Sequence, residues 1–333
     1  MLYTWDEILD LEHKWDNLLL GNGFSCNIWK KYSYDSLLKY SKKNGVEPVL
    51  NEDVFQIFRN LATSNFEDVL KALTLTAIVK EAIGEEVDDI LELYEDVRNN
   101  LFNTVHATHI PFDVLEKKLI GEELAKYRKV FTTCYDLIPY WSAFHTISSS
   151  KQVDFFWNYN GFDPNDTNIY NPKRVTAFYY LHGALHLQSS LAGETRKISG
   201  TSKSLPLGDS YNHRDTSLPL FITEGTSRYK LSKIQSNSYL NFCLEQLSNF
   251  DGNIVIIGQG LDPVFDQHLI DALLDNQNIS KIAISIFSGL DKRDQRKAVR
   301  GYKERLSNSD AILYFFESHT HPLCSKEINS NKV

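Results

Sequence analysis

The most constraining feature of this chain is an apolar run, residues 18–20, that breaks into Gly21-Asn22-Gly23-Phe24-Ser25. A continuous apolar run is typical of a buried parallel strand, and glycine permits the close backbone approach that a strand-to-helix turn needs. The N–H groups at the start of the next helix carry about half a positive charge and favour a bound phosphate. The segment therefore predicts a phosphate-binding turn or, because the full Gly-x-Gly-x-x-Gly spacing is missing, a turn whose glycines have only a steric role.

Length and cysteine usage exclude several classes of protein. The 333 residues are enough for a large core in two domains, or in one domain with an insertion. The four cysteines are scattered, with no Cys-x-x-Cys pair for zinc and no disulfide framework. No window approaches the ~20 apolar residues of a membrane span. We therefore expect a cytoplasmic protein without a metal and without membrane attachment.

The charge balance opposes direct binding to nucleic acid. The formal net charge is -8, and the pI is about 5.7. The one basic stretch, residues 292–305, contains acidic residues and has helical spacing, which favours a solvated helix face over a docking patch. Nucleic acid is therefore expected only through a partner complex.

Hydrophobic periodicity predicts an α/β protein. A helix is expected at 4–15 and a strand at 17–20, followed by a helical stretch with helices at 66–83 and 85–107. Further strands are expected at 129–133, 153–157, 175–181, 218–223, 253–257, 281–287 and 311–316. Further helices are expected at 227–247, 263–274 and 292–306. This alternation predicts a Rossmann-like parallel sheet with helices on both faces. We divide the chain into an N-terminal helix and first strand (1–26), a helical insertion (27–128) and the remainder of the Rossmann-like domain (129–333).

Polar residues follow five of the expected strands, where ligands bind in parallel sheets. The clusters are Gly21 to Ser25; Thr133, Cys134, Tyr135 and Asp136; His182 and Gly183; Gly258, Gly260, Asp262 and Asp266; and Ser285 to Gly289. Plainer interpretations exist for some members. Gly258 and Gly260 suit an ordinary strand-end turn, and Asp266 suits the first turn of a helix.

The order Gly-Asn-Gly-x-Ser, Thr-Thr-x-Tyr-Asp, Leu-His-Gly, Gly-x-Gly-Leu and Ser-Ile-x-x-Gly resembles the sirtuin-like superfamily of NAD-consuming proteins. The resemblance covers nearly the whole chain, and residues 219–227 and 239–240 resemble its bacterial anti-phage branch. Members of that branch are often encoded beside a HerA-like hexameric ATPase. The resemblance implies an NAD+ hydrolase that acts in anti-phage defence with such an ATPase. We also expect a homo-oligomer, with the helical insertion as a place for self-assembly or partner contact, although its helices equally suit covering the chain's own sheet.

The resemblance also implies roles for individual residues. Those expected to bind NAD+ are Gly21, Asn22, Gly23, Phe24, Ser25, Thr133, Tyr135, Gly258, Gly260, Asp266 and Ser285, with the first loop on the pyrophosphate. Asp136 would face the nicotinamide amide, and His182 would accept a proton from ribose or water. The plain alternative for His182 is a hydrogen-bonded core residue. A metal on His182 and His186 is not expected, because no third ligand is evident.

Cys134 departs from the family pattern, in which hydrolases usually have asparagine. A thiol cannot donate two N–H bonds, so either Asn160 or Asn22 supplies the amide, or turnover is slow, or the domain binds NAD+ without consuming it. A thiolate nucleophile and a small buried packing residue are further interpretations. Two functions therefore remain: an NAD+ glycohydrolase, and a scaffold that binds NAD or ADP-ribose and regulates the partner ATPase.

Overall fold

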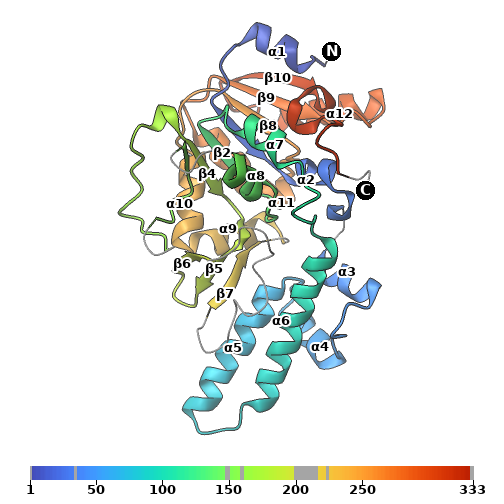
Figure 1. Cartoon of the computed structure of the whole chain (residues 1–333), viewed down its shortest axis with the longest axis vertical. Helices are drawn as coiled ribbons and strands as arrows, with labels where there is room; N and C mark the ends of the chain where they lie inside the picture. Colours follow the sequence, from blue (N-terminus) through green and yellow to red (C-terminus); the bar gives the residue numbers. More distant parts are fainter. Residues whose placement is uncertain are drawn as a thin grey trace.

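The computed structural model describes residues 2–33, 36–146, 151–157, 161–198, 217–222 and 225–330. Its centre is a parallel sheet in the order β10-β9-β8-β1-β2-β4-β3 (Figure 1). The strands are β1 (Asn17–Leu20), β2 (Lys129–Thr132), β3 (Gln152–Val153), β4 (Thr176–Tyr180), β8 (Ile254–Ile257), β9 (Lys281–Ile286) and β10 (Ile312–Glu317). The predicted Rossmann-like α/β fold is confirmed.

Helices flank this sheet and form a separate projection from it. They are α1 (Trp5–Leu11), α2 (Asn22–Ile28), α3 (Leu37–Asn44), α4 (Glu52–Asn60), α5 (Phe66–Ala82), α6 (Asp88–Thr108), α7 (Lys117–Leu124), α8 (Ile138–Thr146), α9 (Ser227–Gln235), α10 (Ser238–Leu247), α11 (Pro263–Asp275) and α12 (Lys292–Arg305). Figure 1 shows α5 and α6 as a long hairpin that extends away from the sheet, with α3 and α4 beside it. In the described part of the chain, no helix has both the length and the apolarity to cross a bilayer.

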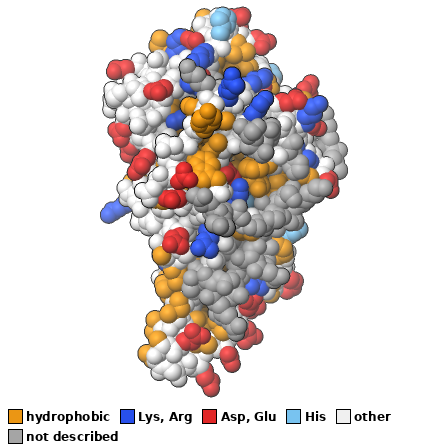
Figure 2. Space-filling model, turned by 60° about the vertical axis from the view of Figure 1, so that its left-hand side comes forward, with side chains coloured by type: hydrophobic (Ala, Val, Ile, Leu, Met, Phe, Trp, Pro, Cys, Tyr) orange, Lys and Arg blue, Asp and Glu red, His pale blue; other side chains and the backbone are white. Residues whose placement is uncertain are grey.

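The hairpin does not bury all of its apolar surface. Leu75, Ile78, Val79 and Ile83, at helical spacing, are each more than 40% exposed. Figure 2 shows hydrophobic side chains at the surface of the lower part of the molecule, where the hairpin lies. The opposite side of α5 is buried through residues such as Leu70, so the helix packs on one side only.

A second, antiparallel sheet corrects one sequence prediction. Strands β5 (Gly183–Ser190), β6 (Thr195–Lys197) and β7 (Ser217–Phe221) pair in the order β6-β5-β7. The strand expected at 218–223 therefore belongs to this sheet and not to the parallel alternation, and its residue 223 lies outside the described residues. Gly183 permits the turn from β4 into β5, because its φ is +72° and a Cβ there would lie 2.1 Å from the Leu220 carbonyl oxygen. The strand expected at 153–157 is only the two-residue β3.

The strand order places a switch point beside β1. The chain runs from β1 to β2 on one side, and later returns to β8 on the other side. In open α/β sheets the crevice beyond such a point is the usual ligand site. The three leucines of β1 are fully buried, as expected for a central strand.

At this switch point the loops after β1 and β8 touch backbone to backbone. The Gly23 N–H donates to the Gly258 carbonyl oxygen at 2.9 Å. A Cβ on Gly23 would lie 2.8 Å from Gly258 Cα, and a Cβ on Gly258 would lie 2.3 Å from the Phe24 nitrogen. Gly258 also has a φ of +68°. Steric need therefore accounts for these two glycines whether or not a ligand binds.

We expect Gly258→Ala to lower the free energy of unfolding by roughly 3 kcal/mol or more, since it combines backbone strain with a backbone clash. Gly260→Ala is the matched control, because a Cβ there would meet nothing within 4 Å. The free energy of unfolding of that variant should equal that of the original protein or exceed it by up to about 1 kcal/mol. Urea unfolding of the three proteins checks this, and equal losses in both variants would contradict it.

Candidate functional site

A cavity of about 390 Å³ opens at the switch point. Loops after β1, β2, β4 and β8 line it, together with residues of α9 and α11. A second cavity of about 610 Å³ adjoins it, and the two share Gly258, Gln259 and Gly260 in their walls. The second cavity is bordered by hydrophobic side chains such as Phe287 and Leu290, and by Tyr302 of α12. The two cavities therefore lie against the same loop after β8.

The structure brings many of the predicted site residues to these cavities. The first cavity is lined by Asn22, Thr133, Cys134, Tyr135, His182, Gly258, Gly260 and Asp266. The second is lined by Gly23, Gly258, Gly260 and Ser285. Gly21, Phe24, Ser25 and Asp136 line neither of the two.

Ser25 and Asp136 pair with each other beneath the first cavity. The Ser25 hydroxyl donates to Asp136 Oδ2 at 2.5 Å, and the backbone N–H of Ile138 donates to Oδ1 at 2.9 Å. Burial raises the pKa of Asp136 to about 6. The carboxylate expected to face a nicotinamide amide therefore faces Ser25, and the pair ties the loop after β1 to the loop after β2.

The start of α2 offers fewer free donors than the sequence suggests. The Gly23 N–H is taken by Gly258, and the Phe24 N–H donates to the Gly21 carbonyl oxygen at 2.9 Å. The Asn22 side chain lines the first cavity. Any contact with a phosphate at this loop therefore falls to Asn22 more than to a ring of N–H groups.

Cys134 is a buried thiol in the cavity wall. Burial, and secondarily the nearby Asp136, raise its pKa far above the usual value for cysteine. A thiol that stays protonated is a poor nucleophile, so the geometry favours a neutral lining residue. Asn160, one candidate for the missing amide, lies outside the described residues.

His182 is buried but lines the first cavity. Its Nε2 lies 2.9 Å from His268 Nε2. Burial, then the charge of Lys230, lower its pKa well below the usual value for histidine, so the ring is neutral near pH 7. His186 lies on β5 with its ring against Tyr140 and Tyr180. Across the described ranges, no three His, Cys, Asp or Glu side chains gather as a metal site requires.

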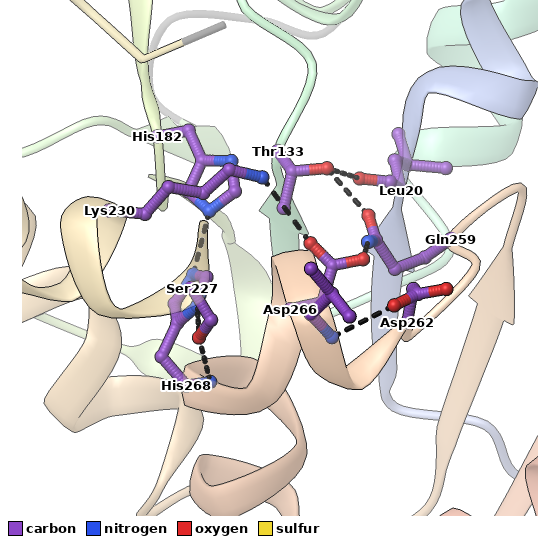
Figure 3. A network of polar contacts seen from close by, with 10 residues as sticks. Leu20, Thr133, His182, Ser227, Lys230, Gln259, Asp262, Asp266 and His268 are labelled. Carbon is purple, nitrogen blue, oxygen red and sulfur yellow. Dashed lines mark hydrogen bonds and ion pairs between the residues drawn. The ribbon is translucent and has the colours of Figure 1, made fainter. Parts of the chain in front are cut away.

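Lys230 and Gln259 complete the polar wall of the first cavity, whereas His268 and Ser227 connect to His182 by hydrogen bonds without lining the cavity themselves (Figure 3). Asp266 Oδ1 lies 3.5 Å from the Lys230 ammonium, and Oδ2 accepts from the Gln259 amide at 2.9 Å. Gln259 Oε1 in turn accepts from the Thr133 hydroxyl at 2.7 Å. The sequence signal for His268 was its position two residues after Asp266, beyond the glycine loop that follows a strand. Lys230 gave none, because it lies on a helix whose packing the sequence does not specify, and Ser227 was marked only as the last residue of the stretch 219–227 that carries the family resemblance.

This wall combines groups of different chemistry around one cavity. A neutral imidazole can accept or donate a proton, and a paired carboxylate can bind hydroxyl groups or stabilise a developing cation. Such a set suits a ligand with a sugar.

The sequence matches the family described as "Domain of unknown function (DUF4917)" over residues 18–324. A solved structure described as "Structural Basis for the Mechanism and Regulation of Sir2 Enzymes" is 11% identical, with 96% of this chain and 94% of that chain covered and a TM-score of 0.36. No curated protein matches the sequence.

We expect Asp136→Asn to stabilise the protein at high pH. The pKa of Asp136 is about 6 when folded and 3.8 in its unperturbed state. Because the pKa of Asp136 is raised in the folded state, its contribution to the free energy of unfolding is present at low pH and is lost as the pH rises from about 4 through 6. Asparagine carries no charge; its Oδ1 can still accept the Ile138 N–H, and its Nδ2 can donate to the Ser25 oxygen, which reverses that bond. The advantage of the variant should grow by roughly 2 kcal/mol between about pH 4.5 and pH 8.

Urea unfolding at the two pH values measures this difference. Asp271→Asn, at an exposed position of α11, is the control and should show no such pH dependence. A constant difference for Asp136→Asn would mean that this carboxyl is not perturbed.

Proposed function

The chain belongs to the DUF4917 family, whose description names no reaction, and from the geometry of its cavity we propose that it is an NAD+ glycohydrolase. In this reaction the bond between nicotinamide and ribose C1′ breaks, and nicotinamide leaves with the electron pair as a neutral molecule. Water adds to the cationic ribose carbon and loses a proton. The products are nicotinamide, ADP-ribose and a proton.

The proposal rests chiefly on His182 and Asp266 lining one cavity beside the switch point. The transition state resembles an oxocarbenium ion, so a carboxylate nearby stabilises it, as in glycoside hydrolysis. Asp266 is positioned for this by Lys230 and Gln259. The neutral His182 is available to take the proton from the attacking water or a ribose hydroxyl, a contribution worth about 10²–10⁴ in rate.

The two adjoining cavities support a dinucleotide as the ligand. The nicotinamide ribose would occupy the first cavity, and the pyrophosphate would cross at Gly260, where a Cβ would meet nothing within 4 Å. The second cavity, with Phe287 and Tyr302, suits a planar adenine ring. Asn22 would supply the side-chain amide that the family pattern places at Cys134. Asp136 would act indirectly, by holding Ser25 below the site.

The defence role and the HerA-like ATPase are part of the same proposal and are supported only by the sequence resemblance. The alternative is a scaffold that binds NAD+ or ADP-ribose and regulates that ATPase. Cys134 in place of asparagine is the observation that favours it. NAD+ binding without nicotinamide release, with and without the ATPase, would establish the scaffold and overturn the hydrolase.

We expect His182→Ala to reduce nicotinamide release by at least about a hundredfold while NAD+ binding is retained. His13→Ala, at an exposed position, is the control and should keep full activity. Chromatographic measurement of nicotinamide, with calorimetric measurement of NAD+ binding, tests this. Undiminished release by His182→Ala would remove the proposed base.

We expect kcat/KM to fall on the acid side at a lower pH than it would with an ordinary histidine as the base. A base must be unprotonated, and burial lowers the pKa of His182 well below the usual value. A histidine with the usual pKa near 6.5 would lose about tenfold by pH 5.5. The profile should be measured in Asp136→Asn as well, since Asp136 itself titrates near pH 6. A tenfold fall by about pH 5.5 in both proteins would contradict the assignment of His182.

A further inference from the structure

Two side chains that were given no role from the sequence, those of His268 and Ser227, connect to His182 through an unbroken chain of hydrogen bonds (Figure 3). His182 Nε2 lies 2.9 Å from His268 Nε2, and His268 Nδ1 lies 2.8 Å from Ser227 Oγ. Ser227 Oγ also accepts the backbone N–H of His268 at 2.8 Å. The three residues are at most 6% exposed, so water does not compete for these bonds. An unpaired donor here would cost about 1–3 kcal/mol.

A hydrogen bond between two ring nitrogens contains one proton, so the chain has two arrangements. In the first, the Ser227 hydroxyl donates to His268, His268 Nε2–H donates to His182, and His182 carries its own proton on Nδ1. In the second, His268 Nδ1–H donates to Ser227, and His182 Nε2–H donates to His268. Nδ1 of His182 then has a free lone pair. Only the second arrangement lets His182 accept a proton from a ligand at Nδ1.

The charge of Lys230 favours the second arrangement. Lys230 lines the cavity with His182, and Figure 3 shows it beside the His182 ring, whose second nitrogen is turned away from His268. Its positive charge acts on both imidazoles. A cation attracts a lone pair and repels an N–H. Asp266, the acidic member of this network, is occupied by Lys230 and Gln259.

We propose that Ser227 and His268 are positioning residues that hold His182 with Nε2–H donated to His268 and with the Nδ1 lone pair open to the cavity. The catalytic consequence of this arrangement rests on the proposed NAD+ glycohydrolase function, whereas the tautomer of His182 does not. As the water oxygen bonds to ribose C1′, the O–H bond breaks and the proton moves to Nδ1. The resulting imidazolium donates Nε2–H to His268, a charge-assisted bond that stabilises it.

Nitrogen NMR of the protein labelled with ¹⁵N-histidine tests the tautomer without substrate. His182→Asn identifies the His182 signals by their loss. We expect the original protein to show a protonated Nε2 and an unprotonated Nδ1 at His182. Ser227→Ala removes the acceptor for His268 Nδ1–H, so His268 should become protonated on Nε2 and His182 on Nδ1. Ser227→Thr retains a hydroxyl and should keep the original pattern.

Activity gives a second, separate measurement. Ser227→Ala should lower kcat for nicotinamide release at least about tenfold with KM little changed, and Ser227→Thr should restore most of it. A protonated Nδ1 in the original protein, or an unchanged tautomer in Ser227→Ala, would overturn the inference. If the tautomers are as expected and the original protein releases no nicotinamide, the positioning role stands and the proposed reaction fails.

Discussion

The backbone contact between the loops after β1 and β8 determines the arrangement of the rest of the site. Gly23 and Gly258 have no room for a side chain, so the two loops lie closer together than other residues allow. This brings Gln259 into reach of Thr133 on the next loop, and Tyr302 donates to the Gln259 carbonyl oxygen at 2.7 Å. The wall shared by the two cavities is therefore held by the loop after β2 and by α12.

Much of the parallel sheet could be predicted, because strands buried on both faces consist of continuous apolar residues. The apolar segments 18–20 and 254–257 are examples. The antiparallel sheet could not, because its partners, residues 183–190 and 217–221, are far apart in the sequence and their pairing depends on tertiary contacts. The strand expected at 153–157 was predicted too long because tertiary contacts also decide its extent. The aromatic residues that follow β3, such as Phe155 and Phe156, are buried in the core without forming a strand.

The lining of the cavity was predictable only where residues directly follow strands of the parallel sheet, since topology alone brings those loops together. His182, which follows β4, was placed there in this way, whereas the position of Asp266 also depends on how α11 packs. The contacts of His268 with His182 and Ser227 could not be predicted, because helix packing decides which of these side chains meet. The bond between Ser25 and Asp136 was also missed. Both residues were expected to face a ligand, and sequence order does not distinguish a residue on a cavity wall from one just below it.

Helix α9 has contacts in two directions. Its Tyr229 and Lys233 bind Asp68 of the projecting hairpin, while its Lys230 lines the cavity and its Ser227 bonds to His268. These contacts all lie within the nine residues of one helix. A displacement of the hairpin that tilts α9 would therefore also shift the groups around His182. By thermodynamic reciprocity, a molecule that fills the cavity would in turn bias the orientation of the hairpin.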